Sequence, residues 1–150
     1  MVKIMYQNSI VEYQEGVSRS YIVELERELG QKLPKDLIQH YHLYNGGRLD
    51  EKSYFDGGGL IELQIEEFLV MGENSNLSFE STIKRIKNEK KLIPRDFFPF
   101  AINSGGDFYC MDTCGKIYFC SMDMSNSFDN VTLISNSITE FVDGMYEPDW

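Results

Sequence analysis

The sequence predicts an α+β fold in one domain, with a mostly antiparallel sheet flanked by helices. Three observations lead to this prediction. The chain has 150 residues, 42% of them hydrophobic, which suits one packed core. Helix-type and strand-type patterns partly segregate along it. Two strand-type runs, 107–112 and 116–121, are joined by a three-residue loop ending in Gly115, as in an antiparallel hairpin. We expect one domain over residues 1–150, with its core at about 17–145.

Two helices are predicted in the first third of the chain. The first runs from Ser18, a favoured N-cap, to about Leu29, and Gly30 suits a left-handed stop. The second covers about 35–44 and follows a proline, which fits the first turn of a helix. Asn45-Gly46-Gly47 should end it, because these residues tolerate positive φ. Both helices carry apolar side chains at helical spacing.

The middle of the chain is more ambiguous. Residues 66–71 fit either a strand or a helix, and their short length favours a strand. Gly57-Gly58-Gly59 is interpreted as a loop or strand bend, since no phosphate-loop helix follows it. Ser78 should begin a third helix that reaches about Lys90. Five basic side chains are expected to face solvent from this region: Lys84, Arg85, Lys87, Lys90 and Lys91.

The last third is rich in strand patterns. Strands are predicted at 98–102, 107–112, 116–121 and 131–134, the second and third forming the hairpin. The sequence Ser137-Ile138-Thr139-Glu140 is a capping box and should open a final helix.

The acidic charge is unevenly distributed. The net charge is -10, from 14 basic and 24 acidic residues. Residues 50–74 carry 1 basic and 7 acidic groups, residues 75–97 carry 6 and 3, and residues 98–150 carry 1 and 8. An acidic chain is a poor binder of nucleic acid, which requires clustered Lys and Arg, and of the negatively charged cytoplasmic membrane surface. A basic protein partner, a cation and simple solubility remain open.

The sequence favours a cytoplasmic protein. The first ten residues lack the basic and apolar regions of a signal peptide, and no apolar stretch approaches the length of a membrane span. The three cysteines, an odd number, are expected to be reduced thiols. Cys110 and Cys120 should be core residues, whereas Cys114 should be exposed in the hairpin turn.

No catalytic or metal site is indicated by residue spacing. His40 and His42 are two residues apart on a helix and cannot chelate one metal together, so His40 is expected at the surface and His42 at the surface or in helix packing. The cysteine spacing is unlike that of zinc sites. We therefore expect no metal, no cofactor and no enzymatic activity. A thiol enzyme using Cys114 is a minor alternative, because the sequence places no cation near it except Lys116.

The order of several short motifs adds a family resemblance. A helix ending in Gly30 is followed by Leu33-Pro34-Lys35-Asp36, a second helix and Asn45-Gly46-Gly47. The later motifs are Ile93-Pro94, Phe98-Pro99-Phe100-Ala101, Gly105-Gly106-Asp107, Gly115-Lys116-Ile117-Tyr118-Phe119 and Ser135-Asn136-Ser137-Ile138. Together they resemble the SUKH superfamily of Smi/Knr-type domains over about residues 17–145.

The resemblance implies a function in protein binding. Bacterial members are mostly immunity proteins that neutralise a cognate toxin domain, often a nuclease or deaminase, and fungal members are regulatory interaction proteins. We expect a cytosolic immunity protein, monomeric or a weak homo-oligomer, that binds a basic toxin domain. A regulatory or scaffolding module of the same fold is the alternative.

The acidic segments supply the predicted partner-binding residues, because an acidic surface is steered to the basic cleft of a toxin that acts on nucleic acid. Tyr118 and Trp150 are added as aromatic anchors. The full predicted set is Glu62, Glu66, Glu67, Glu73, Asp112, Tyr118, Asp123, Asp129 and Trp150.

Overall fold

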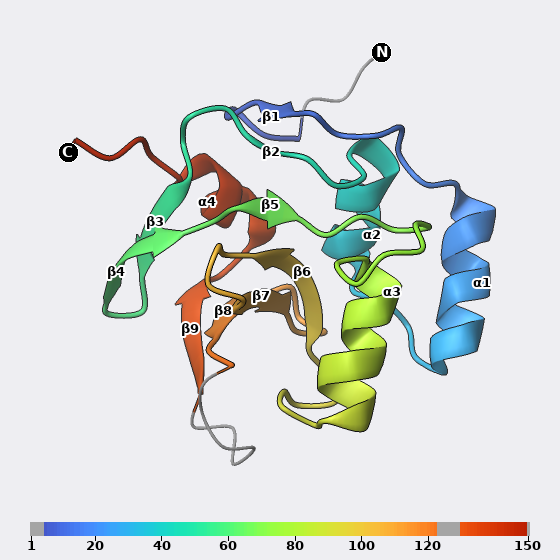
Figure 1. The fold of residues 1–150 in the computed structure, drawn as a ribbon. Helices are drawn as coiled ribbons and strands as arrows, with labels where there is room; N and C mark the ends of the chain where they lie inside the picture. Colours follow the sequence, from blue (N-terminus) through green and yellow to red (C-terminus); the bar gives the residue numbers. More distant parts are fainter. Residues whose placement is uncertain (1–4, 123–129, 150) are drawn as a thin grey trace.

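A five-stranded antiparallel sheet forms the centre of the molecule (Figure 1). The computed structural model describes residues 5–122 and 130–149. The strands lie in the order β5 (Glu67–Phe68), β6 (Phe98–Ile102), β7 (Phe108–Met111), β8 (Ile117–Cys120) and β9 (Val131–Ser135). Each strand pairs with the next along the chain, so the predicted α+β class with an antiparallel sheet is confirmed.

Two small antiparallel pairs lie beside this sheet. The N-terminal strand β1 (Ile10–Val11) pairs with β2 (Arg48–Leu49), and β3 (Tyr54–Gly57) pairs with β4 (Leu60–Gln64). The predicted glycine bend lies at the turn between β3 and β4, where Gly58 and Gly59 both have positive φ.

The helices are α1 (Arg19–Leu29), α2 (Lys35–Leu43), α3 (Phe79–Thr82) and α4 (Ile138–Asp143). A π-helix, η1 (Ile83–Glu89), continues α3 without a break. Figure 1 shows α1, α2 and α3 together on one side of β6, with the β3–β4 hairpin at the opposite end of the sheet.

The predicted helix ends are confirmed by their capping contacts. The Ser18 hydroxyl accepts a hydrogen bond from the Tyr21 N–H, and Gly30 ends α1 with φ 68°. The Ser137 hydroxyl accepts from the Glu140 N–H at the start of α4. These contacts satisfy helix-end groups that otherwise lack partners.

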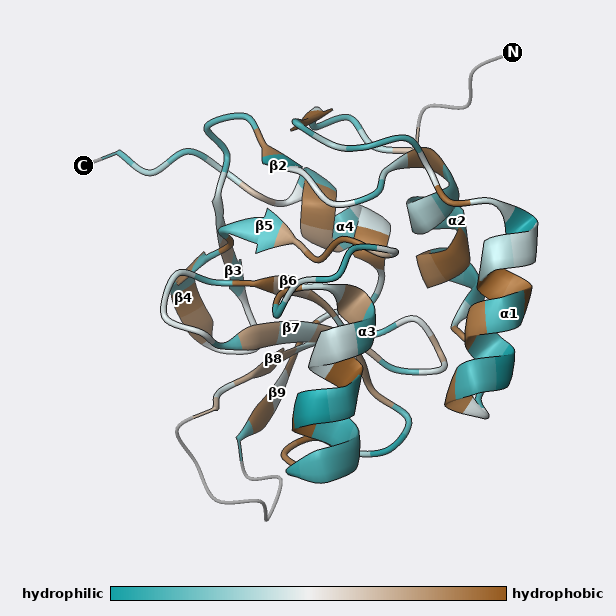
Figure 2. Ribbon diagram, turned by 45° about the vertical axis from the view of Figure 1, so that its right-hand side comes forward, coloured by the Kyte–Doolittle hydropathy of each residue, from teal (hydrophilic) through white to brown (hydrophobic). Residues whose placement is uncertain are grey.

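The core is formed largely by aromatic rings around the sheet. Phe141 of α4 contacts Phe55, Phe100 and Tyr109, with ring centroids 5.0–5.9 Å apart. All residues of β6 and β7 are buried, so both faces of these central strands are covered. Figure 2 shows the contrast between the hydrophobic strands and the hydrophilic lower half of the helix labelled α3.

Lys87 corrects the prediction that the basic side chains of the third helix all face solvent. Lys87 is only 5% exposed. It follows buried Ile83 by four residues in a segment with i→i+5 hydrogen bonding, which brings residues four and five apart to one side. Its amine donates to the Phe97 carbonyl at 3.2 Å, and a long apolar stem makes this burial feasible.

His40 corrects the prediction of a surface histidine. Its side chain is fully buried, and its Nδ1 shares a 2.7 Å hydrogen bond with the Tyr6 hydroxyl. Its ring also contacts Tyr41 and Phe68. Burial lowers the pKa of His40 from 6.5 to about 3, so the ring is neutral near pH 7.

The prediction for residues 66–71 is correct only in part, whereas the predictions for the three cysteines are confirmed. Only Glu67–Phe68 of the predicted 66–71 strand pairs as a strand, with an isolated parallel bridge at Val70. Cys110 and Cys120 are buried and Cys114 is exposed, as predicted. Within 5–122 and 130–149, no helix has the length and apolar character needed to cross a membrane.

Candidate partner-binding site

A concavity of ≈ 290 Å³ lies where the N-terminal segment, β5 and the loop before α3 meet. We call it the acidic groove. Its lining residues are Glu12, Gln14, Asn45, Gly46, Gly47, Glu67, Phe68, Val70, Glu73, Ser75 and Leu77.

Asn45 fixes the floor of the acidic groove. Its side-chain amide donates to the Met71 carbonyl at 2.9 Å and accepts from the Met71 N–H at 2.7 Å. Its backbone exchanges two hydrogen bonds with Gln14. One buried asparagine therefore joins the N-terminal segment to the chain beyond β5, so the Asn45-Gly46-Gly47 motif has a structural role beyond ending α2.

Gly47 allows the strands beside the groove to approach each other. Its φ is 88°, and an added Cβ would lie 2.7 Å from the Val11 carbonyl oxygen. The Gly47 carbonyl also accepts the Phe68 N–H at 2.8 Å. A side chain here would both strain the backbone and separate β1 from β2.

Carboxylates outnumber cations around this groove. Glu12 pairs with Arg48 at 2.8 Å, which lowers the pKa of Glu12. The same pair raises the pKa of Arg48, and the nearby charges of Asp50 and Glu66 add to this shift. Glu67 and Glu73 line the groove without an ion pair to any described cation. The groove therefore has an excess of negative charge.

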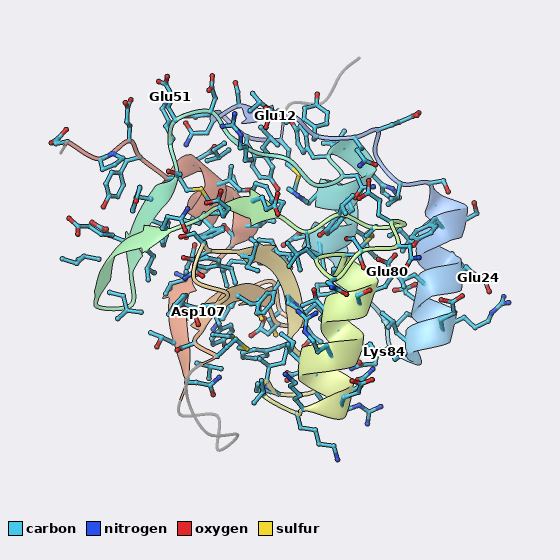
Figure 3. All side chains as sticks on the ribbon, viewed as in Figure 1. Glu12, Glu24, Glu51, Glu80, Lys84 and Asp107 are labelled. Carbon is cyan, nitrogen blue, oxygen red and sulfur yellow. The ribbon has the colours of Figure 1, made fainter. Side chains whose placement is uncertain are left out.

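Polar and apolar side chains complete the surface. Gln14 Nε2 donates a hydrogen bond to the Glu73 carboxylate. Leu77 lines the groove and is 42% exposed, and nearby Tyr13 is 46% exposed with its ring edge against Tyr44. In Figure 3, Glu12 and Glu51 both lie along the upper edge of the molecule. Apolar contacts beside charged groups are typical of protein-binding surfaces.

The fold brings three of the predicted residues to this region. Glu67 and Glu73 line the groove. Glu66 is close enough to Arg48, the ion-pair partner of Glu12, for its charge to raise the pKa of Arg48. Glu62 is exposed on β4 and does not line the groove; its backbone N–H donates to Asp56. Asp123, Asp129 and Trp150 lie outside the described residues.

Asp112 and Tyr118 lie together at the β7–β8 hairpin. The Asp112 carboxylate accepts from the backbone N–H of Cys114 and Lys116 and from the Tyr118 hydroxyl. Asp112 is 9% exposed. Burial of the Tyr118 hydroxyl and its hydrogen bond to Asp112 raise the pKa of Tyr118 to about 12. Both side chains thus stabilise the turn, and their role in partner binding stays a prediction.

The side chains that the sequence prediction missed include Glu12, Tyr13, Gln14 and Leu77. The first three belong to the N-terminal segment, whose two-residue strand has no clear pattern. Residues 1–49 as a whole carry no net charge. The pairing of Ile10 with Leu49 and the backbone hydrogen bonds between Gln14 and Asn45 bring that segment to the groove.

No group of three or more His, Cys, Asp or Glu side chains in the described segments could hold a metal ion. Both histidines lie on α2, and His42 donates through Nδ1 to the Val17 carbonyl at 2.8 Å.

Comparisons with known proteins identify one family. The family model of SMI1 / KNR4 (SUKH-1) matches residues 16–144. An SPbeta prophage-derived protein of Bacillus subtilis (strain 168), YokK, is 30% identical over 136 residues, covering 79% of this chain and 69% of that protein. A crystal structure of a protein from Pseudomonas syringae pv. tomato has the same fold, with a TM-score of 0.59 and 12% identity over 92% of this chain and 88% of that chain.

Proposed function

The chain belongs to the SMI1 / KNR4 family (SUKH-1), and we propose that it is an immunity protein that neutralises a cognate toxin domain by stoichiometric binding. The observation that carries this proposal is the acidic groove, where carboxylates from distant segments converge beside exposed Leu77. The relative YokK is prophage-derived, which is consistent with a gene that functions in conflict between cells or phages.

The proposed mechanism combines charge and shape. A toxin that acts on nucleic acid presents a basic cleft to the phosphate backbone. Glu67 and Glu73, with Glu66 beside them, would meet that cleft and accelerate association, and Leu77 would pack against an apolar contact. The immunity protein would then block the cleft sterically. It would act in the cytoplasm and without a catalytic step of its own.

The first experiment tests the partner. The C-terminal domain of the toxin-like gene next to this gene would be expressed with and without the immunity protein. We expect growth rescue and co-purification at equal stoichiometry. Rescue without any physical complex would contradict binding as the mechanism, and a stable complex with a non-toxic regulatory protein instead would favour the scaffolding alternative.

The second experiment tests the groove. A triple variant, Glu66→Gln/Glu67→Gln/Glu73→Gln, should associate with the toxin domain on the order of ten times more slowly at low salt. The difference should shrink as the salt concentration rises, because salt screens exposed charges. The measurement is stopped-flow or surface-plasmon kinetics.

A matched control removes the same number of charges elsewhere. Glu24, Glu28 and Glu89 are exposed on α1 and η1, outside the groove, and their replacement by Gln should leave association much less affected. Equal slowing by both variants would mean that net charge alone, and not the acidic groove, governs binding.

A further inference from the structure

A second concavity, of ≈ 460 Å³, lies between the segment that follows α1 and the end of η1. We call it the cationic pocket. It is lined by Leu29, Gln31, Lys87, Asn88, Lys91, Ile93 and Arg95. In Figure 1 the C-terminal ends of α1 and of the helix labelled α3 lie at the same end of the molecule.

The charge of this pocket is opposite to that of the acidic groove. Three of its lining side chains are cationic, two are amides and none is a carboxylate. Among the described residues, none of these three cations forms an ion pair, since the ion pairs found there involve Arg27, Lys32 and Arg48. Unpaired cations gathered around a concavity favour an anion.

Lys87 gives the pocket a buried charged group. Its amine lies 3.9 Å from the centre of the Phe98 ring and donates to the Phe97 carbonyl. Burial, with a further contribution from the charge of Arg95, lowers the pKa of Lys87 from 10.5 to about 8. A bound anion would therefore offset the repulsion between the charges of Lys87 and Arg95.

The shape of the pocket points to a small molecule. Its volume lies within the range of about 300–1,000 Å³ typical of small-molecule sites. Ile93 and Leu29 supply apolar surface beside the cations, and Gln31 and Asn88 supply amide groups. Gln31 is held in place because its Nε2 donates to the Arg95 carbonyl at 3.0 Å.

We propose that the cationic pocket binds a small organic phosphate, with Lys91 and Arg95 contacting the phosphate oxygens and Ile93 and Leu29 contacting the organic part. A phosphate carries up to two charges on several oxygens, which matches two or three cations better than a single carboxylate would. The Lys87 amine adds a positive charge to the pocket wall, and its contacts with Phe97 and Phe98 hold that charge in place.

The test is isothermal titration calorimetry of the full chain at low ionic strength with three probes: AMP, inorganic phosphate and adenosine. AMP should bind at least ten times more tightly than inorganic phosphate, and adenosine should not bind measurably. Equal binding of AMP and inorganic phosphate would overturn the contact with the organic part. Absence of binding by both would overturn the proposal.

Variants locate the site. Lys91→Gln/Arg95→Gln should weaken AMP binding at least ten-fold, and both positions are exposed, so the fold should be retained. Lys84→Gln/Lys116→Gln removes two charges from exposed positions outside the pocket, and Lys84 is labelled in Figure 3. An equal loss of binding in both variants would contradict the assigned site. Toxin binding by the Lys91/Arg95 variant should be unchanged, which keeps this proposal separate from the proposed function.

Discussion

The side chain of Asn45 pairs with the backbone of Met71 in both directions, donating to its carbonyl and accepting from its N–H. Aspartate has nearly the same shape but cannot donate when ionised. We expect Asn45→Asp to lower the free energy of unfolding by about 2–3 kcal/mol, because a buried carbonyl loses its donor and faces a charge. Urea unfolding measures this, with exposed Asn74→Asp as the control. Similar losses in both variants would contradict a specific role for the Asn45 amide.

Gly47→Ala tests the close approach at the groove. The added methyl would lie 2.7 Å from the Val11 carbonyl oxygen in a backbone with φ 88°. We expect a loss of at least about 2 kcal/mol in the free energy of unfolding. Gly106→Ala is the matched control, because Gly106 has φ 90° but nothing within 4 Å of its Cβ position, so it should cost only about 1 kcal/mol. Equal costs would mean that strain alone, and not the approach of β1, requires glycine.

The buried His40 should make the protein sensitive to mild acid. Its pKa is lowered to about 3 in the folded state against about 6.5 when unfolded, so the unfolded chain binds the extra proton below pH 6.5. The contribution of neutral His40 to the free energy of unfolding is fully present above pH 6.5 and is lost as the pH falls toward 3. Relative to His40→Phe, the wild type should lose about 2 kcal/mol of unfolding free energy between pH 7 and pH 5. Parallel stability curves of the two proteins would exclude a neutral buried His40.

Lys87 should also make stability rise with pH, but in mild alkali. The pKa of its amine is about 8 when folded and about 10.5 when unfolded, so the unfolded chain binds more protons between these values. Stability therefore rises with pH across this window. Relative to Lys87→Met, the wild type should gain about 2 kcal/mol between pH 8 and pH 10. The comparison with the variant removes the contributions of tyrosines and cysteines that both proteins share, and a constant difference would contradict the burial of a charged amine.

Local signals predicted most of the fold. Ser18, Gly30 and Ser137 marked helix ends because capping depends on neighbouring residues only. The β7–β8 hairpin was predicted from its loop and its flanking apolar runs for the same reason. Family membership followed from the order of these local motifs and is confirmed over residues 16–144.

Tertiary contacts account for what sequence reasoning missed. His40 and Lys87 were expected at the surface by residue type, but each finds a polar partner inside, the Tyr6 hydroxyl and the Phe97 carbonyl. Neither partner is adjacent in sequence to the residue it satisfies. Glu12 joined the candidate site through long-range contacts of the N-terminal segment, the pairing of β1 with β2 and the hydrogen bonds between Gln14 and Asn45. Such long-range partners cannot be identified from spacing in a single sequence.

The order of the sheet also has a consequence for how the protein folds. Strands β6 to β9 pair with their neighbours along the chain, so these ladders can form early and close only short loops. The two-residue pairing of β1 with β2 closes a much longer loop, from Ile10 to Leu49, for little contact. We expect this N-terminal segment to dock last and to exchange its amide protons first. The acidic groove would then be completed only in the final step of folding.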